Sequence, residues 1–150
     1  MSKENQSREI RSEVTSDGQL KLSIKSVEMP KPKDHEVLLK VEASPINPSD
    51  LGLLISFAAD LSSITSEGSG DDKVTTMNIL PALHKTMTAR FDKSMKVGNE
   101  GGGVVVDAGE AGKGLIGKTV GVAGGAMYSE YRCVPVDSCL VMNEGTTPKE

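Results

Sequence analysis

The chain has 150 residues, of which 37% are hydrophobic and only 3% aromatic, and its formal net charge is −4. A domain of this length can bury a core without disulfides or metals, and aliphatic side chains must build that core. The charges are scattered with no Lys/Arg block, which argues against a nucleic-acid partner, and neither a membrane-spanning run nor a signal-peptide core is present. We therefore expect a soluble, cytoplasmic protein with no membrane partner.

The first part of the chain predicts strands. From Arg8 to Met29, two extended stretches flank Asp17-Gly18, a dipeptide that favours a two-residue hairpin turn, so a β-hairpin should open the fold. Residues Glu36 to Ala43 then mix apolar and charged side chains as a half-buried strand does. This strand must stop pairing at the segment from Pro45 to Pro48, because proline cannot donate ladder hydrogen bonds.

The middle of the chain predicts two short helices and a polar loop. Ser49 is a residue type that caps helices, and apolar residues follow it at helical spacing: Leu51, Leu54, Ile55 and Ala58. Residues Thr65 to Thr76 are rich in Ser, Gly and Asp, have nothing to bury, and predict a mobile loop. Pro81 suits a first helical turn, and apolar residues at four-residue spacing extend this second helix: Leu83, Met87 and Phe91.

The last third predicts three more strands, over Gly101 to Asp107, Gly117 to Ala123 and Tyr128 to Val136. Strands this closely spaced favour an antiparallel barrel or sandwich over a parallel α/β sheet. The end of the chain, from Asn143 to Glu150, carries the signal for the start of a helix with no helix after it. The expected fold is mainly β with a few short helices.

One glycine-rich string imitates two nucleotide-binding motifs. Residues Gly112 to Thr119 match the P-loop pattern G-x-x-x-x-G-K-T, and Gly112 to Gly117 also spell the Rossmann fingerprint G-x-G-x-x-G. Both motifs require a helix directly afterwards, because the helix N-terminus holds the phosphates. The residues from Val120 to Gly125 favour a strand instead, so we interpret the string as a turn between strands.

The cysteines and histidines suggest no site. Cys133 and Cys139 match neither a disulfide framework nor a Cys-x-x-Cys metal or redox pair, and are expected to be free thiols. His35 and His84 are isolated, and we assign them no role in the chemistry.

Three segments in order resemble the catalytic domain of medium-chain dehydrogenase/reductases, whose fold is called GroES-like. They are EVLLKVEASPINPSD (Glu36 to Asp50), VGNEGGGVVVDAG (Val97 to Gly109) and GKTVGVAGGAMYSEYRCVP (Gly117 to Pro135). The resemblance implies that residues 1–150 form a partly open antiparallel β-barrel. It also implies a Rossmann domain, absent from this chain, with nicotinamide and substrate bound in the cleft between the two domains.

The resemblance is to the zinc-independent branch of the family, the quinone oxidoreductases and related enoyl-thioester reductases. Zinc alcohol dehydrogenases place Cys and His ligands where this chain has Asn47 and Asn99. Neutral amides are poor substitutes for thiolate and imidazole ligands, and the four cysteines of the structural zinc lobe are also missing. We therefore expect no metal.

The implied function is NAD(P)H-dependent reduction of a quinone or an α,β-unsaturated carbonyl by hydride transfer. Such acceptors are already electrophilic, so the protein must orient them and donate hydrogen bonds to the developing oxyanion, without a strong Lewis acid. An amide NH₂ can donate, which makes Asn47 the first candidate for the cleft. Asn47 and Pro48 are the expected contacts to the cofactor, which is NADPH or NADH and needs the missing domain.

The resemblance implies further site residues. Ser49 matches a proton-relay hydroxyl of the zinc enzymes, with a plain helix cap favoured over that role. Asp50 matches an acidic residue near the active site, with orientation of its neighbours favoured over acid catalysis. Asn99 and Glu100 are expected to line the substrate pocket, and Gly101 to Gly103 to serve tight packing.

Residues 51–97 form a longer segment than the family has, and we treat them as an insertion with short helices and a mobile loop. The insertion is compatible with a lid or an interaction surface, and equally with a disordered loop. The isolated chain is expected to be inactive, and a homodimer is compatible with the sequence. A rival hypothesis is a stand-alone GroES-like barrel that acts, like the ring-forming co-chaperonins, through a mobile interaction loop.

Overall fold

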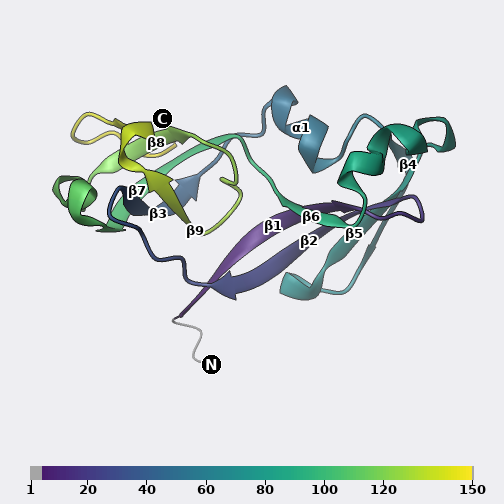
Figure 1. Cartoon of the computed structure of the whole chain (residues 1–150), viewed down its shortest axis with the longest axis horizontal. Helices are drawn as coiled ribbons and strands as arrows, with labels where there is room; N and C mark the ends of the chain where they lie inside the picture. The colour runs from purple at the N-terminus through teal and green to yellow at the C-terminus, as the bar shows by residue number, and fades with distance from the viewer. Residues whose placement is uncertain (1–4, 150) are drawn as a thin grey trace. The chain divides into compact units, whose positions relative to one another are not determined.

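The computed structural model describes residues 5–149. They form ten strands in two five-stranded antiparallel sheets, with one short α-helix and several 3-10 helices (Figure 1). The described chain divides into two compact units, which are treated one at a time. Unit 1 holds residues 5–9, 26–45 and 98–149, and unit 2 holds residues 10–25 and 46–97. The predicted mainly β, antiparallel fold with a few short helices is confirmed.

The first sheet has the strand order β4-β5-β2-β1-β6. Its strands are β1 (Gln6–Val14), β2 (Gln19–Glu28), β4 (Ala59–Glu67), β5 (Val74–Ile79) and β6 (Lys93–Lys96). In unit 2, buried apolar side chains pack into one core cluster: Val14, Leu20, Ala58, Met77, Ile79 and Met87. Apart from Ala58 and Met87, these residues come from the strands of this sheet, so the sheet supplies most of the core of this unit.

The opening hairpin is confirmed, but its turn is one residue longer than expected. The Gly18 N–H donates to the Thr15 carbonyl at 3.0 Å, and the Thr15 N–H donates to the Gln19 carbonyl at 2.7 Å. Gly18 has φ +92°, whereas Asp17 does not have a positive φ. This is the three-residue loop in which only the last position is left-handed, not the two-residue turn that needs two such positions.

The prediction of a mobile loop over residues 65–76 is wrong. These residues form the end of the β4–β5 hairpin, where Thr65 pairs with Thr76 and Ser66 with Thr75. The hydroxyls of Ser66 and Thr75 lie 2.8 Å apart in a cross-strand hydrogen bond. Polar composition therefore marks solvent-facing strands here, because Ser and Thr side chains can bond across a ladder.

The pairing of β4 with β5 is interrupted between Asp60 and Thr65. In this bulge, the Ser62 N–H donates to Asp60 Oδ1 at 3.0 Å, and the Ser63 hydroxyl donates to the Asp60 carbonyl. The Asn78 N–H in turn donates to Ser63 Oγ at 2.8 Å. Side chains therefore replace part of the regular ladder on this edge strand.

Both predicted helices exist but differ in extent or type. Helix α1 (Pro48–Leu54) ends four residues before Ala58, since Ser56 takes a left-handed φ of +63°. The second is a 3-10 helix, η3 (Pro81–Arg90), in which Met87 is buried. The spacing of the apolar residues thus predicted where the two helices lie. It did not predict the length of the first helix or the 3-10 type of the second.

The second sheet lies in unit 1 and has the strand order β10-β8-β7-β3-β9. Its strands are β3 (Glu36–Ala43), β7 (Glu100–Ala108), β8 (Thr119–Ala123), β9 (Tyr131–Pro135) and β10 (Cys139–Val141). Its core side buries a second apolar cluster: Val37, Leu39, Val105, Val120, Val122, Met127 and Val134. Each sheet keeps two edge strands, which agrees with the expected partly open β fold.

The P-loop-like string is a connection between two neighbouring antiparallel strands. The 3-10 helix η4 (Glu110–Leu115) and a turn at Gly117 lead from β7 into β8, which begins at Thr119. The residues after Gly-Lys-Thr are strand, so no helix N-terminus faces the string. The interpretation of this string as a turn between strands is confirmed.

An ion pair in unit 1 links the beginning of β1 to the residue before β9. Arg8 donates through Nε and Nη2 to Oε1 of Glu130, and its backbone N–H donates to Oε2 at 2.9 Å. The hydrogen bonds from the Arg8 side chain lower the pKa of the Glu130 carboxyl. A carboxyl with a lowered pKa in the folded state stabilises the fold above its unfolded pKa, and this contribution is lost as the pH falls.

We expect Glu130→Gln to lower the free energy of unfolding at pH 7 by less than about 1 kcal/mol, because both side chains are largely solvent-exposed. The difference from the native chain should shrink below about pH 4, where the native carboxyl also becomes protonated. Urea denaturation across this pH range measures both effects. A difference that stays constant with pH would show that the ion pair is not its source.

Candidate functional site

The predicted site residues fall into two groups, one in each unit. Asn47, Pro48, Ser49 and Asp50 lie together at the start of α1 in unit 2. Asn99 and Glu100 lie together at the start of β7 in unit 1.

The start of α1 is organised around Asn47 and Asp50. Asn47 is the N-cap residue, in extended conformation, and Pro48 takes the first helical position. The Asn47 N–H donates to Asp50 Oδ2 at 2.8 Å, and the Asp50 N–H donates to the side chain of Asn47 as well as to its backbone carbonyl, at 2.9 Å from the latter. Together they form a capping box across the first turn, which fixes the backbone of Asn47 relative to the helix.

The prediction that Ser49 caps this helix is wrong, because Asn47 occupies that position. Proline is favoured at the first helical position, where its missing N–H costs nothing, so Pro48 moves the cap back to the residue before it. Ser49 is exposed in the first turn, whereas Asp50 is 2% exposed. Asp50 therefore acts on its neighbour's backbone, in keeping with the orienting role expected for it.

The start of β7 is tied to the loop that follows β8. The Asn99 carbonyl accepts the N–H groups of Gly124 at 3.1 Å and Gly125 at 3.0 Å. Asn99 is exposed, while Glu100 is half-buried and its carbonyl accepts the Ser44 hydroxyl. This arrangement holds Glu100 beside the end of β3.

Gly98, the residue before Asn99, accepts no side chain. Its φ is +91°, and a Cβ there would lie 2.5 Å from the Tyr128 ring and 2.6 Å from the Tyr128 nitrogen. The Tyr128 hydroxyl donates to the Pro45 carbonyl at 2.9 Å. Tyr128 thus links the Gly98–Asn99 turn to the segment that follows β3.

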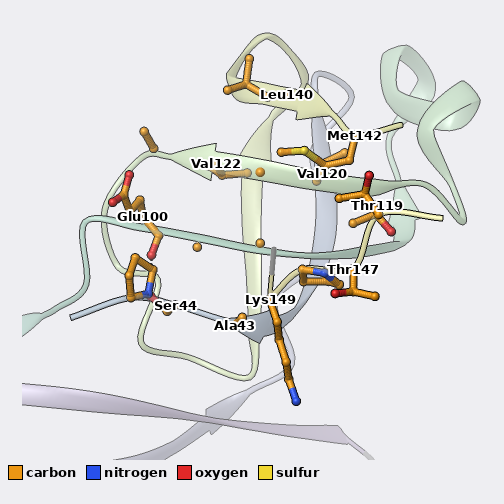
Figure 2. Close-up of a pocket in the computed structure, with 17 residues that line it drawn as sticks. Ala43, Ser44, Glu100, Thr119, Val120, Val122, Leu140, Met142, Thr147 and Lys149 are labelled. Atoms are coloured by element: carbon orange, nitrogen blue, oxygen red, sulfur yellow. The ribbon is translucent and has the colours of Figure 1, made fainter. Parts of the chain in front are cut away.

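A pocket of about 550 Å³ lies beside Glu100, entirely within unit 1 (Figure 2). Figure 2 shows Glu100 and Ser44 at one end, Thr119 and Thr147 at the other, and Leu140 and Met142 on the side of β10. This volume falls within the range of pockets that bind small molecules. The lining combines apolar side chains and glycines with one carboxylate, four hydroxyls and Lys149.

The register of the sheet explains why there is space here. Ala43 pairs with Gly102, Gly102 with Gly121, and Gly121 with Leu140, so these four residues share one face across β3, β7, β8 and β10. A Cβ on Gly121 would lie 2.6 Å from the Met142 methyl carbon. The floor of the pocket is therefore made of backbone and small side chains, on the face opposite the core residues Val120 and Val122.

Other reactive groups lie outside this arrangement. Cys133 and Cys139 are half-buried free thiols, as expected, and burial raises the pKa of both. Within residues 5–149, no three His, Cys, Asp or Glu side chains are placed to hold a metal ion together. No helix in this part of the chain is long and apolar enough to cross a membrane.

Sequence reasoning placed Glu100 in a pocket but missed most of the pocket. Ser44, Gly121, Met142 and Thr147 line it, and none of them was predicted as a pocket residue. The available signal was the glycine run at Gly101 to Gly103 opposite a second glycine-rich strand, which we had assigned to tight packing alone. Only the register of four strands shows which of these glycines faces outward.

No family model matches the chain, and no curated protein shows significant sequence similarity to it. Several solved structures do match. A Bacillus thuringiensis protein named as a candidate NADPH:quinone reductase is 20% identical, with a TM-score of 0.61, over 96% of this chain and 35% of its own. The human synaptic vesicle membrane protein VAT-1 homolog-like protein is 18% identical, with a TM-score of 0.60, over 95% of this chain and 37% of its own.

Etr1p, solved in complex with NADP and crotonyl-CoA, is 17% identical, with a TM-score of 0.55, over 91% of this chain and 34% of its own. This chain has the fold of one portion of these proteins. The predicted likeness to quinone reductases is thereby confirmed at the level of the fold. The chain spans little more than a third of the length of each of these three proteins.

Proposed function

We propose that this chain is the substrate-side domain of an NAD(P)H-dependent oxidoreductase that reduces a quinone or an α,β-unsaturated carbonyl by hydride transfer. The observation that carries the proposal is the capping box that holds Asn47 at the start of α1, within a fold shared with reductases. The chain then belongs to the medium-chain dehydrogenase/reductase family and works with a nucleotide-binding domain.

The start of α1 suits the nicotinamide end of such a cofactor. Pro48 is exposed and offers a small apolar ring, and Asn47 beside it offers an amide. The phosphate end finds no equivalent partner in the string from Gly112 to Thr119, since that string enters a strand. A second domain must therefore bind the phosphates, and the cofactor, when bound, supplies the hydride.

The residues of α1 then have separable roles. As hydride reaches the electrophilic carbon of the acceptor, negative charge develops on the carbonyl oxygen, and the Asn47 NH₂ donates a hydrogen bond to it. Asp50 holds Asn47 through the bond to its backbone N–H. Ser49, exposed in the first turn, is our choice for the hydroxyl that passes a proton to the reduced product.

The proposal needs no metal. Asn47 and Asn99 stand where zinc enzymes of the family have ligands, and amides are weak zinc ligands beside thiolate or imidazole. A hydrogen-bond donor suffices for an acceptor that is already electrophilic.

The rival hypothesis of a co-chaperonin-like interaction module has lost its supporting feature. It relied on a mobile loop over residues 65–76, and these residues form a paired hairpin. No other feature of the described residues favours it, and we keep the reductase as the single proposal.

The experiment that tests the proposal compares the chain alone with the same chain joined to the nucleotide-binding domain of one of the similar reductases. With NADPH and a quinone or enone, the chain alone should give no turnover, and the joined protein should oxidise NADPH in proportion to acceptor reduced. Saturable NADPH oxidation by the 150-residue chain alone would overturn the proposal. So would binding of neither acceptor class by the folded, joined protein.

A further inference from the structure

Helix α1 depends for its placement on a residue far away in the sequence. It has only seven residues, and helices this short are unstable on their own in water. Its last carbonyls have no partner within the helix and must find one elsewhere. The orientation of α1, and of Asn47 at its other end, is therefore set by whatever binds its C-terminal carbonyls.

Two side chains take these carbonyls. Arg90 Nη2 donates to the Leu53 carbonyl at 2.9 Å and to Ser12 Oγ at 3.0 Å. The Ser12 hydroxyl in turn donates to the Leu54 carbonyl at 2.9 Å. Ser12 is fully buried on β1, and Arg90 ends η3, so the last turn of α1 is held from two separate segments of unit 2.

The burial of Arg90 makes its hydrogen bonds to Ser12 and the Leu53 carbonyl important. Its Nε is buried and has no hydrogen-bond partner within residues 5–149, and burial lowers the pKa of the guanidinium. A half-buried cation with an unmet donor costs free energy unless its remaining bonds are strong. Bonds from a cation to the carbonyls at a helix C-terminus are of that kind, because the partial charges there are negative.

The same segment holds the residues that follow α1. The Ser56 hydroxyl contacts Met87 Sγ at 3.5 Å, and the Leu80 N–H donates to the Ala58 carbonyl at 2.8 Å. Ile55 and Leu83 both pack against the core cluster of unit 2. Contacts at the end of α1 and just beyond it thus connect the helix to residues 80–90.

We propose that Arg90 is a positioning residue, which through Ser12 and the Leu53 carbonyl sets the orientation of α1 and so of Asn47. Residues 80–90 accordingly hold in place the helix that carries Asn47, and we call them the brace of α1. This inference rests on the proposed function only in giving Asn47 a catalytic purpose. The brace itself is a property of unit 2 and is testable in the 150-residue chain.

The test uses the ¹⁵N-labelled chain and three substitutions. Arg90→Met removes the hydrogen-bond donors and keeps most of the apolar stem. Arg90→Lys keeps the positive charge and a donor, and removes the Nε that has no partner. Arg11→Met is the matched control. Arg11 also donates to a backbone carbonyl in unit 2, that of Ser94, at the opposite edge of the sheet from β4. The readouts are the side-chain NH₂ signal of Asn47, the exchange rates of the α1 amides, and the melting temperature.

Arg90→Met should shift the Asn47 NH₂ signal and speed exchange of the α1 amides about tenfold relative to those of β2 and β5. Arg90→Lys should restore both, and Arg11→Met should lower the melting temperature without either change. If Arg90→Met does not fold, Ser12→Ala gives the same comparison, since it removes the hydroxyl that Arg90 and Leu54 share.

An unchanged Asn47 signal in folded Arg90→Met, or equal shifts in Arg11→Met, would overturn the proposal. Failure of Arg90→Lys to restore the signal would do so as well. None of these outcomes depends on turnover. If Arg90 orients α1 but Asn47 has no effect on hydride transfer, the proposed function is wrong and the inference about Arg90 still holds.

Discussion

Replacement of Gly103 by alanine should cost the chain about 3 kcal/mol or more of its free energy of unfolding. A Cβ at this position would lie 1.9 Å from the Lys40 carbonyl oxygen and 2.8 Å from its carbon. Both atoms belong to the backbone of β3, the central partner of β7, and cannot rotate away as a side chain could. The two strands would have to separate at the Val41–Gly103 pair, next to the core residue Val105.

Gly114→Ala is the matched control, because no atom lies within 4 Å of the position its Cβ would take. It should change the free energy of unfolding by no more than about 0.5 kcal/mol. Urea denaturation followed by circular dichroism gives both values. Equal stability of the Gly103→Ala and Gly114→Ala proteins would show that β3 and β7 do not approach each other as described.

Asn47→Asp should reduce the rate of hydride transfer about 10²- to 10³-fold in the chain joined to a nucleotide-binding domain. Aspartate is as good an N-cap as asparagine, so the start of α1 should be preserved. The substitution replaces the NH₂ donor by a charged acceptor, which repels the oxyanion of the reduced acceptor. Stopped-flow oxidation of NADPH under single-turnover conditions measures this step directly.

Asn47→Ser provides the comparison, since serine also caps helices and still offers a hydroxyl donor. It should lose less of the rate than Asn47→Asp, with a melting temperature close to that of the native protein. If Asn47→Asp transfers hydride at the native rate while α1 remains intact, Asn47 does not contact the acceptor oxygen. The proposed role of this residue would then be wrong, whether or not Arg90 orients α1.

The strands that were predicted well are those with a buried face. Residues 36–43 were predicted with the bounds observed for β3, because Val37 and Leu39 point into the core and the charged neighbours point away. The paired ends of β4 and β5, residues 65–67 and 74–76, were mistaken for a loop because most of their side chains are hydroxyl-bearing or acidic. Only pairing with β2, through contacts distant in sequence, turns this composition into a sheet.

The candidate site could be predicted in part. A helix start was predicted at Ser49 and Asp50, and the helix exists, but it begins one residue earlier at Pro48 with Asn47 as its cap. The pocket beside Glu100 could not be derived, because it depends on the register of four strands and on residues 142–149. The contacts of Arg90 could not be predicted either, because they join residues that are 37 and 78 positions apart in the sequence.

The bulge between Asp60 and Thr65 bears on how this protein behaves at high concentration. A sheet edge with free N–H and C=O groups can recruit further strands, and such recruitment begins aggregation. Leu61 and Ile64 are largely exposed on β4, and on a regular edge strand they would favour such pairing. Because the pairing of β4 is interrupted here and Asp60 Oδ1 already accepts the Ser62 N–H, we expect an incoming strand to find no continuous ladder, and this edge to aggregate less readily than a regular edge with the same exposed apolar side chains.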